Sequence, residues 1–387
     1  MQKSSLRFFI FIIIIGIIGQ LSAEIIAPSL PYIAYDFGVK DGLAQYTISY
    51  YMLGMAIPAM IFGIYADRIG RRKVLIVSSC LGLIGSLLCV IAPNIYILIF
   101  ARIIQGIAFG GISSMSMTLL RDRFNGIALA RYMSYFGIAF SLSIDLAPFI
   151  GGFIQAVVSW RIILLIILLQ NLCVLYMSYK YQEIYIYPEK TAILDGLIDK
   201  MKVIFKDKNF AVYTILNGII YAIFMSYIVV ATFIIQTILH QSSIYYGVLT
   251  LCLSVVFAFF CFINGRLVGK VNPNKLITLG FALSVISGLF LMLNIYIGLG
   301  IVLFIISIIP MFIGSAFVFP NVNSLAYTTI SKDIGLASAM SNTIKLFMAF
   351  WVTWLIGLFS SGTTVLGVSI TLMAGLALII TISLVDN

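Results

Sequence analysis

The chain has 387 residues, of which 62% are hydrophobic and 9% are charged, and its net charge is +10. A soluble domain carries about 25% charged residues, so this composition excludes a soluble protein and indicates an integral membrane protein. The basic residues lie in loops between apolar runs. That placement is typical of cytoplasmic loops and argues against a nucleic-acid partner.

Apolar runs of about 20 residues, the length that a membrane-spanning helix needs, recur along the whole chain. They predict an all-α integral membrane fold with twelve transmembrane helices. We expect Pro28 and Pro31 to end the first span, because proline interrupts helical hydrogen bonding. The expected spans are residues 7–33, 44–65, 74–92, 95–119, 131–156, 160–179, 210–238, 245–267, 275–296, 299–326, 334–358 and 363–384.

The positions of the 23 basic residues predict the orientation of these spans. If both termini are cytoplasmic, the outer loops contain only Lys40 and Arg161, and only Arg102 and Lys345 fall inside spans. The other basic residues then lie on the cytoplasmic side, where loops between spans carry an excess of Lys and Arg. Both termini are therefore predicted to be cytoplasmic.

A polar stretch divides the chain into two halves. Residues 1–180 and 209–387 are expected to form two pseudo-symmetric six-helix bundles, joined by a cytoplasmic linker at 181–208. A weak repeat supports the division. The loops Gly63–Lys73 and Gly265–Lys275 have equal length, and each begins with a glycine and ends with a lysine. Parallel repeats of this kind are found in transporters that rock about a site near the membrane midplane.

Two motifs in the first half carry a family resemblance. The loop Gly63–Lys73 reads GIYADRIGRRK, and it resembles the Gly-x-Leu-x-Asp-Arg-x-Gly-Arg-Arg-Lys motif of the major facilitator superfamily, with only Tyr65 departing from it. The segment Arg102–Gly106 in the fourth span is similar to the Arg-x-x-Gln-Gly motif of the same family. The resemblance implies two bundles of six helices and transport rather than catalysis.

Two further motifs resemble a narrower group. The segment Ala147–Gly152 is similar to the Gly-Pro-x-x-Gly-Gly motif of the drug:proton antiporter branch, with alanine in the first position. In the first span, Glu24, Pro28 and Pro31 resemble the Asp-x-x-x-Pro-x-x-Pro signature of the bicyclomycin/chloramphenicol resistance (Bcr/CflA) group, with glutamate in the place of the acid.

This resemblance implies proton-coupled export of a small molecule, a drug or a siderophore-like metabolite, across a bacterial inner membrane. The coupling ion is the proton, with no other cofactor, and the partners are the substrate and the lipid bilayer. We expect a monomer. The alternative is a proton-coupled importer or facilitator of a small nutrient, and the antiporter-type motif in the fifth span favours export. The chain has no P-loop, and its five cysteines and one histidine predict no metal site and no enzyme.

Two acidic residues inside spans are candidates for proton coupling. A charge at the membrane centre costs about 2.5–3.5 kcal/mol on insertion scales, so such residues are functional candidates. Glu24 either loads and releases the coupling proton or forms a permanent ion pair with Arg102. Asp145 is either a second titrating group or a residue that faces water or caps backbone near Pro148.

The substrate is expected to contact residues from both halves. Arg102 either controls the protonation of Glu24 or donates to helix carbonyls, and Gln105 either holds its guanidinium or contacts the substrate. Lys345, near the middle of the eleventh span, is expected to pair with Glu24 or Asp145 or to bind an anionic substrate group. The seventh span adds polar and aromatic groups that either line the cavity or serve helix packing, namely Asn217, Tyr221, Tyr227 and Gln236.

The loop after the second span and several small residues complete the prediction. The loop either supplies plain topology charge or acts as a cytoplasmic latch that gates transport. Its candidate residues are Gly63, Asp67, Arg68, Gly70, Arg71 and Arg72. Close helix packing and hinge motion are expected at Gly106, Pro148, Gly151 and Gly152.

Overall fold

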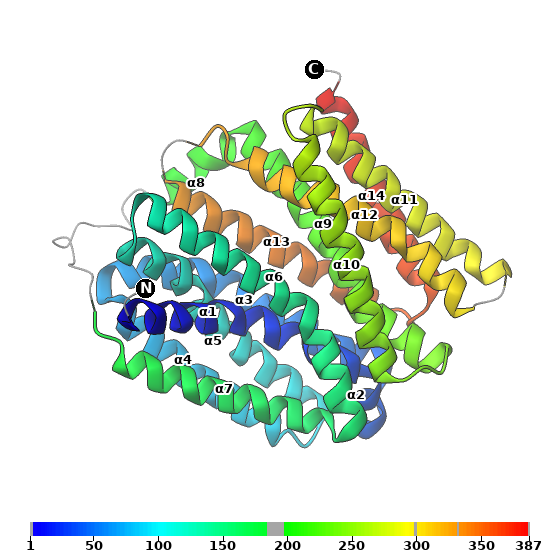
Figure 1. Cartoon of the computed structure of the whole chain (residues 1–387). Coiled ribbons are helices and arrows are strands. Elements are labelled where there is room, and N and C mark those ends of the chain that lie inside the picture. Colours follow the sequence, from blue (N-terminus) through cyan, green and yellow to red (C-terminus); the bar gives the residue numbers. More distant parts are fainter. Residues whose placement is uncertain (1–2, 184–196, 298–299, 331–332, 386–387) are drawn as a thin grey trace. The chain divides into compact units, whose positions relative to one another are not determined.

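The computed structural model describes residues 3–183, 197–297, 300–330 and 333–385. These residues are almost entirely helical (Figure 1). In chain order the elements are α1 (Lys3–Glu24), η1 (Ala27–Ser29), α2 (Leu30–Phe37), α3 (Asp41–Ile69), α4 (Arg71–Val90), α5 (Ile95–Arg123), α6 (Gly126–Val157), α7 (Trp160–Lys180), α8 (Leu197–Lys206), α9 (Lys208–Phe233), η2 (Ile234–Ile238), α10 (Ser243–Leu267), α11 (Pro273–Ile297), α12 (Ile301–Ala326), α13 (Ile334–Ile356) and α14 (Thr363–Val385).

The lengths of these helices confirm the predicted all-α membrane fold. Within the described residues, eleven helical segments are long and apolar enough to cross a membrane. The helix α3 adds a further long segment of 29 residues. At about 1.5 Å per residue this length exceeds the hydrocarbon core of a bilayer, which is about 30 Å thick.

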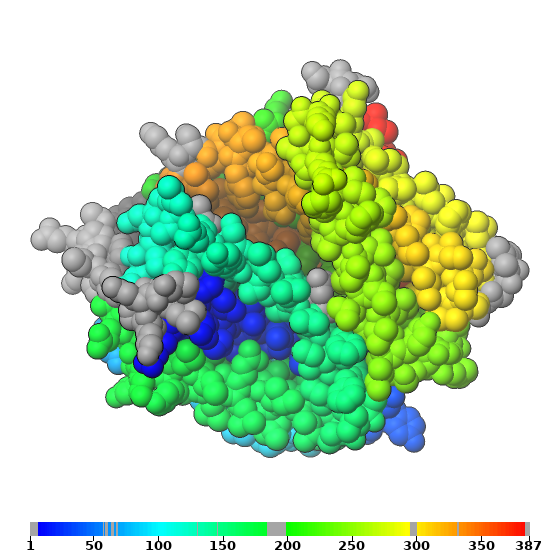
Figure 2. Space-filling model, viewed as in Figure 1, coloured from blue at the N-terminus to red at the C-terminus, as the bar shows by residue number. Residues whose placement is uncertain are grey.

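The helix α6 has an exposed apolar face. Its exposed apolar side chains recur every three or four residues along the helix, so they form one continuous stripe. An apolar stripe of this length on the surface is expected where lipid tails replace water. Figure 2 shows α6 at the surface of the molecule. The stripe consists of Tyr135, Ile138, Leu142, Leu146, Ile150, Phe153 and Val157.

The first span differs from the prediction at its prolines. The helix α1 already ends at Glu24, before the two prolines. The chain then forms the single turn η1 and continues as the helix α2. Pro31 is the second residue of α2, where its missing N–H group is tolerated because the first turn of a helix has no internal acceptor for it. The prolines therefore divide this span into two helices instead of ending it.

The linker also contains a helix that the sequence analysis did not predict. The ten residues of α8 have an amphipathic pattern: Ile204 is buried, while Val203 and Phe205 are exposed beside several lysines. Lys200 Nζ lies 3.5 Å from Asp333 Oδ1 near the start of α13. The lysine-rich composition of this stretch predicts a linker, and the structure shows that residues 197–206 of it are helical.

The helices group into two compact units. Unit 1 comprises Met1–Ser29 and Tyr50–Ile198, and unit 2 comprises Leu30–Ser49 and Asp199–Asn387. In unit 1, α1 contacts α5 and α6, and α4 contacts α5 and α7. In unit 2, α9 contacts α12, α13 and α14, and α11 contacts α12 and α14. The helix α9 is buried along almost its whole length and forms the centre of unit 2.

Glycines bring two helices of unit 1 into backbone contact. A Cβ atom on Gly106 of α5 would overlap the carbonyl oxygen of Tyr51 in α3. A Cβ atom on Gly54 of α3 would overlap the carbonyl oxygen of Ile103 in α5. Only glycine permits this approach, because any other residue places a side chain between the helices.

Unit 2 contains a second close approach, between the beginning of α3 and the end of α13. A Cβ atom on Gly42 would overlap the carbonyl oxygen of Gly357. Next to it, Gln45 Nε2 donates a hydrogen bond of 2.8 Å to Ser361 Oγ. The rings of Tyr46 and Trp354 stack with centroids 6.5 Å apart. These contacts explain why residues 30–49 belong to the same compact unit as α9 and α13.

Candidate proton and substrate sites

Glu24 is a buried carboxylate at the end of α1. Its exposed fraction is 1%, and its Oε1 accepts a hydrogen bond of 2.6 Å from Gln20 Nε2, one helical turn earlier. The helix breaks directly after it, so the carboxylate lies where the backbone changes from α1 to η1. Gln20 was not singled out from the sequence. A polar side chain four residues before an acid in an apolar run is the signal that identifies it.

Arg102 of α5 is fully buried in unit 1 and joins several helices. It donates to the carbonyl oxygen of Ser22 in α1 at 3.0 Å and to Gln105 Oε1. Its guanidinium carbon lies 4.1 Å from the centroid of the Tyr51 ring, a geometry in which a cation is attracted by the face of an aromatic ring. Its bond to the Ser22 carbonyl oxygen joins α5 to α1, and its role in controlling the protonation of Glu24 stays a prediction.

Gln105 and Tyr51 extend this cluster. Gln105 Nε2 donates to Ser86 Oγ of α4 at 2.9 Å, and the Tyr51 hydroxyl donates to the carbonyl oxygen of Gly19 in α1 at 2.6 Å. The cluster therefore joins α1, α3, α4 and α5. Tyr51 reaches Arg102 because Gly54 and Gly106 allow α3 and α5 to touch. Both Tyr51 and Ser86 were missed, because tyrosine and serine are common in spans and their partners depend on the tertiary fold.

The fifth-span motif lies in α6, beside the break in α1. A Cβ atom on Gly151 would overlap the carbonyl oxygen of Ile25, so α6 packs against the backbone directly after Glu24. Pro148 is inside the helix, and both Pro148 and Gly152 are buried. Asp145 belongs to α6, but its side chain lies outside the described residues, so its titration stays a prediction.

Lys345 and Tyr221 meet inside unit 2. Lys345 of α13 is half-buried, and its Nζ lies 4.8 Å from the centroid of the Tyr221 ring on α9. Tyr221 is itself buried. An aromatic face partly compensates a lysine that is removed from water. The expected pairing of Lys345 with Glu24 or Asp145 stays a prediction.

The other predicted residues of α9 have partners within unit 2. Asn217 Nδ2 donates to Asn323 Oδ1 of α12 at 3.0 Å. Tyr227 is fully buried, and its ring packs edge-on against Phe312. Both contacts join α9 to α12, and a role in the substrate cavity stays a prediction. Gln236 lies in η2, where its Nε2 donates to Thr232 Oγ1 at 2.7 Å.

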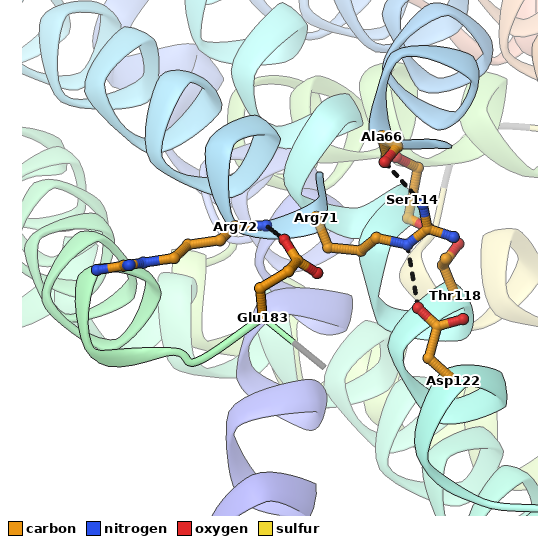
Figure 3. A network of polar contacts seen from close by, with 7 residues as sticks. All are labelled: Ala66, Arg71, Arg72, Ser114, Thr118, Asp122 and Glu183. Atoms are coloured by element: carbon orange, nitrogen blue, oxygen red, sulfur yellow. Dashed lines mark hydrogen bonds and ion pairs between the residues drawn. The ribbon is translucent and has the colours of Figure 1, made fainter. Parts of the chain in front are cut away.

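The loop between α3 and α4 forms a polar network, which Figure 3 shows. Gly70 precedes α4 with φ of 101°, a conformation that favours glycine. Arg71 is buried. Its Nε lies 3.0 Å from Asp122 Oδ2 at the end of α5, and its Nη1 donates to the carbonyl oxygen of Ala66 at 2.7 Å. Ser114 and Thr118 lie beside the Arg71 guanidinium in Figure 3.

Arg72 ties the same loop to the end of α7. Its backbone N–H donates to Glu183 Oε2 at 2.9 Å, and its Nη2 donates to the carbonyl oxygen of Tyr179 at 2.6 Å. Glu183 thereby satisfies a free N–H group at the start of α4, where a negative charge is favourable. Glu183 was missed because it lies in the polar stretch that was assigned to the linker.

Three predicted loop residues cannot be placed in this network. Gly63, Asp67 and Arg68 belong to α3, and the structure describes only their backbone. The latch role of Asp67 therefore stays a prediction. The second copy of the loop has a longer connection between its helices. In the first copy only Gly70 separates α3 from α4, whereas α10 ends at Leu267 and α11 begins at Pro273. Gly269, with φ of 80°, lies in this second connection.

We expect Arg71 and Asp122 to be energetically coupled. Arg71→Gln and Asp122→Asn should each make the protein easier to unfold in SDS, because each leaves a largely buried charge without its partner. The double variant should lose less than the sum, with a coupling energy of about 1 kcal/mol. The matched control is Asp199→Asn, which removes an exposed pair with Lys202 and should change stability little. Additive losses for Arg71 and Asp122 would contradict the pairing.

Comparison with known proteins agrees with this architecture. The model of the Major Facilitator Superfamily matches residues 12–353. A solved structure, the D-xylose–proton symporter, has a TM-score of 0.74 and 17% sequence identity, and the match covers 95% of this chain and 96% of that one. At this identity the likeness concerns the fold alone.

Two similar proteins agree with the narrower resemblance to the Bcr/CflA group. The Bicyclomycin resistance protein homolog of Haemophilus influenzae is 26% identical over 331 residues, which cover 83% of this chain and 79% of that protein. Multidrug resistance protein D of Escherichia coli is 27% identical over 160 residues, or 41% of each chain.

Proposed function

Because the chain belongs to the major facilitator superfamily, and is thus a secondary transporter and not an enzyme, we propose that it exports a small molecule from a bacterial cytoplasm in exchange for protons. The observation that carries the proton coupling is the burial of Glu24 beside Gln20, at the break between α1 and η1. The relatives with resistance names support the direction of transport.

The Glu24 carboxyl group would carry the coupling proton. Its Oε1 accepts from Gln20, and it can do so whether the other oxygen carries a proton or not. Burial disfavours the charged form of a carboxylate and a cation favours it, and the Arg102 cation bonds to a carbonyl oxygen two residues before Glu24. The two protonation states can therefore remain close in free energy, as a group that loads and releases protons requires.

Arg102 would transmit the state of the substrate to this carboxyl group. It donates to the carbonyl oxygen of Ser22, two residues before Glu24, and it is held by Gln105 and Tyr51. A substrate that attracts the guanidinium would change the electrostatic environment of Glu24. A coupling free energy of about 1–3 kcal/mol between substrate and proton is sufficient for linked binding.

The membrane setting of the proposal follows the distribution of charge. We place the protein in the bacterial inner membrane as a monomer with both termini in the cytoplasm. The basic loop Gly63–Lys73 is then cytoplasmic, as the excess of Lys and Arg in cytoplasmic loops requires. The Arg71 and Arg72 contacts would close this side of unit 1 as part of the latch.

Lys345 would favour substrates with an anionic group. We expect Lys345→Gln to weaken binding of fluorescein about five- to tenfold, because it removes a cation from a half-buried position. Rhodamine 123 has the same ring system with a positive charge, and its binding should not weaken. Equilibrium binding to the purified protein measures both dyes, and Lys345→Arg is the variant that should restore fluorescein binding. Equal fluorescein affinities for wild type and Lys345→Gln would contradict this role.

Proton exchange can be tested in proteoliposomes that contain the pH indicator pyranine. The vesicles are loaded with bicyclomycin, clamped electrically with K⁺ and valinomycin, and diluted into drug-free buffer. An antiporter acidifies the interior, because each drug molecule that leaves brings protons in, whichever way the protein is inserted. Symport makes the interior alkaline, and vesicles without protein give the baseline. An alkaline change would contradict the proposed antiport and favour proton-coupled import. Drug transport without any pH change would refute proton coupling.

A further inference from the structure

Unit 2 contains a cavity that has no part in the proposed proton site. Its volume is about 890 Å³, and it lies between α2 with the following turn and η2 with the residues that follow it. All lining residues belong to unit 2, whereas Glu24 and Arg102 belong to unit 1. The volume is within the range of about 300–1,000 Å³ that small-molecule sites have.

The backbone explains why the chain leaves this space open. After α2 it turns at Gly38 with φ of 61°, and after η2 it turns at His240 with φ of 53°. Between them, η2 is a wide helical turn in which Leu239 N donates to the carbonyl oxygen of Ile234. Such wide turns often occur at functional sites. Both turns are part of the described structure and define the ends of the cavity.

Two tyrosines of α2 form an aromatic wall. Tyr32 and Tyr35 are three residues apart, so they lie on the same face of the helix. Both line the cavity, and their exposed fractions are 39% and 85%. The faces of aromatic rings attract cations, particularly organic cations whose weak hydration makes desolvation easy.

The charge of the lining has one sign. Asp41 contributes a half-buried carboxylate, and no Lys or Arg is among the described residues that line the cavity. Burial raises the pKa of the Asp41 carboxyl group, and a hydrogen bond with Ser361 opposes part of this rise. A bound cation would stabilise the ionised carboxylate that burial disfavours. Gln236 and His240 also line the cavity and add polar groups to it.

We propose that this cavity is a binding site for organic cations that carry aromatic rings. The rings of Tyr32 and Tyr35 would stack on the ligand, and Asp41 would supply the counter-charge. In the predicted topology both flanking turns are outer loops, so the site would face the outside of the cell. It differs from the Lys345 region, where the charge is positive, and binding to it does not depend on proton coupling.

The test uses two ions of the same shape and opposite charge. Equilibrium dialysis of the purified full chain should detect saturable binding of tetraphenylphosphonium that exceeds partitioning into empty detergent micelles. Asp41→Asn and Tyr35→Ala should each weaken it about fivefold, by loss of a counter-charge and of an aromatic face. Tetraphenylborate, the anionic analogue, should show no component that depends on these two residues. Tyr96→Ala, an equally drastic change at an exposed tyrosine of α5, is the matched control.

The variants are chosen to leave folding intact. Tyr35 is largely exposed, and asparagine at position 41 keeps a group that can bond to Ser361. If both variants bind tetraphenylphosphonium as the wild type does, the proposed site is refuted. If tetraphenylborate depends on the two residues as strongly, the charge preference is wrong. Since the assay measures no transport, its failure would leave the proposed antiport untouched, and failure of antiport would leave this site untouched.

Discussion

Replacing Glu24 by glutamine is expected to abolish proton-driven drug movement without unfolding the protein. The amide is neutral and nearly isosteric, and it can still accept a hydrogen bond from Gln20, which bonds the carboxylate in the native chain. It cannot release a proton. The drug-dependent pH change in pyranine-loaded proteoliposomes should therefore fall by at least about tenfold, because the amide no longer links proton binding to drug binding.

The Glu24 variant should retain passive exchange. Because the amide resembles the protonated acid, exchange of labelled for unlabelled bicyclomycin across the membrane should continue, and only uphill movement should stop. Asp199→Asn is the matched control, since it removes a carboxylate that is 80% exposed on α8. A Glu24→Gln variant that still accumulates drug against its gradient would show that the coupling proton binds elsewhere, with Asp145 as the first alternative.

Gln20 offers a second test of the same cluster. Gln20→Leu should leave the carboxyl group of Glu24 in place but remove its hydrogen bond. We expect transport to remain proton-coupled while its pH optimum moves, because the hydrogen bond no longer acts on the titrating group. A purely structural Gln20 would lower the amount of transport at every pH by the same factor.

The spans could be predicted from the sequence because each one satisfies a local physical requirement. About 20 apolar residues are needed to cross a bilayer, and α4, α5 and α7 agree with the expected ranges within a few residues. The failures occur where local signals conflict with packing. Pro28 and Pro31 were expected to stop a helix, yet the chain resumes one as α2. The polar composition of residues 181–208 predicted a linker, yet residues 197–206 form the helix α8.

The candidate site was only partly predictable for a related reason. Glu24 and Arg102 are recognisable because a charge inside a span is costly. Their partners Tyr51 and Ser86 carry no such cost, and only the contact between α3 and α5 identifies them. The partners of the loop residues could not be predicted either. Asp122 and Glu183 have no distinguishing feature in the sequence, and only the folded structure shows that they contact Arg71 and Arg72.

Gly106 should tolerate enlargement poorly. A Cβ atom there would overlap the carbonyl oxygen of Tyr51 and lie 3.1 Å from the Cα of Gly54. Both obstacles are backbone atoms, so the helices must separate. Overpacking a core commonly costs about 1–3 kcal/mol, and we expect Gly106→Leu to reach or exceed the upper end. The measurement is unfolding in SDS, together with the yield of monodisperse protein.

The control is Gly137→Leu in α6, where the added Cβ atom would have nothing within 4 Å. This variant should fold as the wild type does. Gly106→Ala tests the functional consequence. This variant should still fold, because alanine separates α3 from α5 less than leucine does. It should nevertheless move the Tyr51 ring away from Arg102, whose guanidinium carbon lies 4.1 Å from the ring centroid in the native structure. Loss of this contact would shift the guanidinium, which donates to the carbonyl oxygen of Ser22 two residues before Glu24, so the pH dependence of transport should change more than its maximal rate. If Gly106→Leu were as stable as the wild type, α3 and α5 would be able to separate at little cost in free energy. The position of Arg102 would then not depend on this glycine.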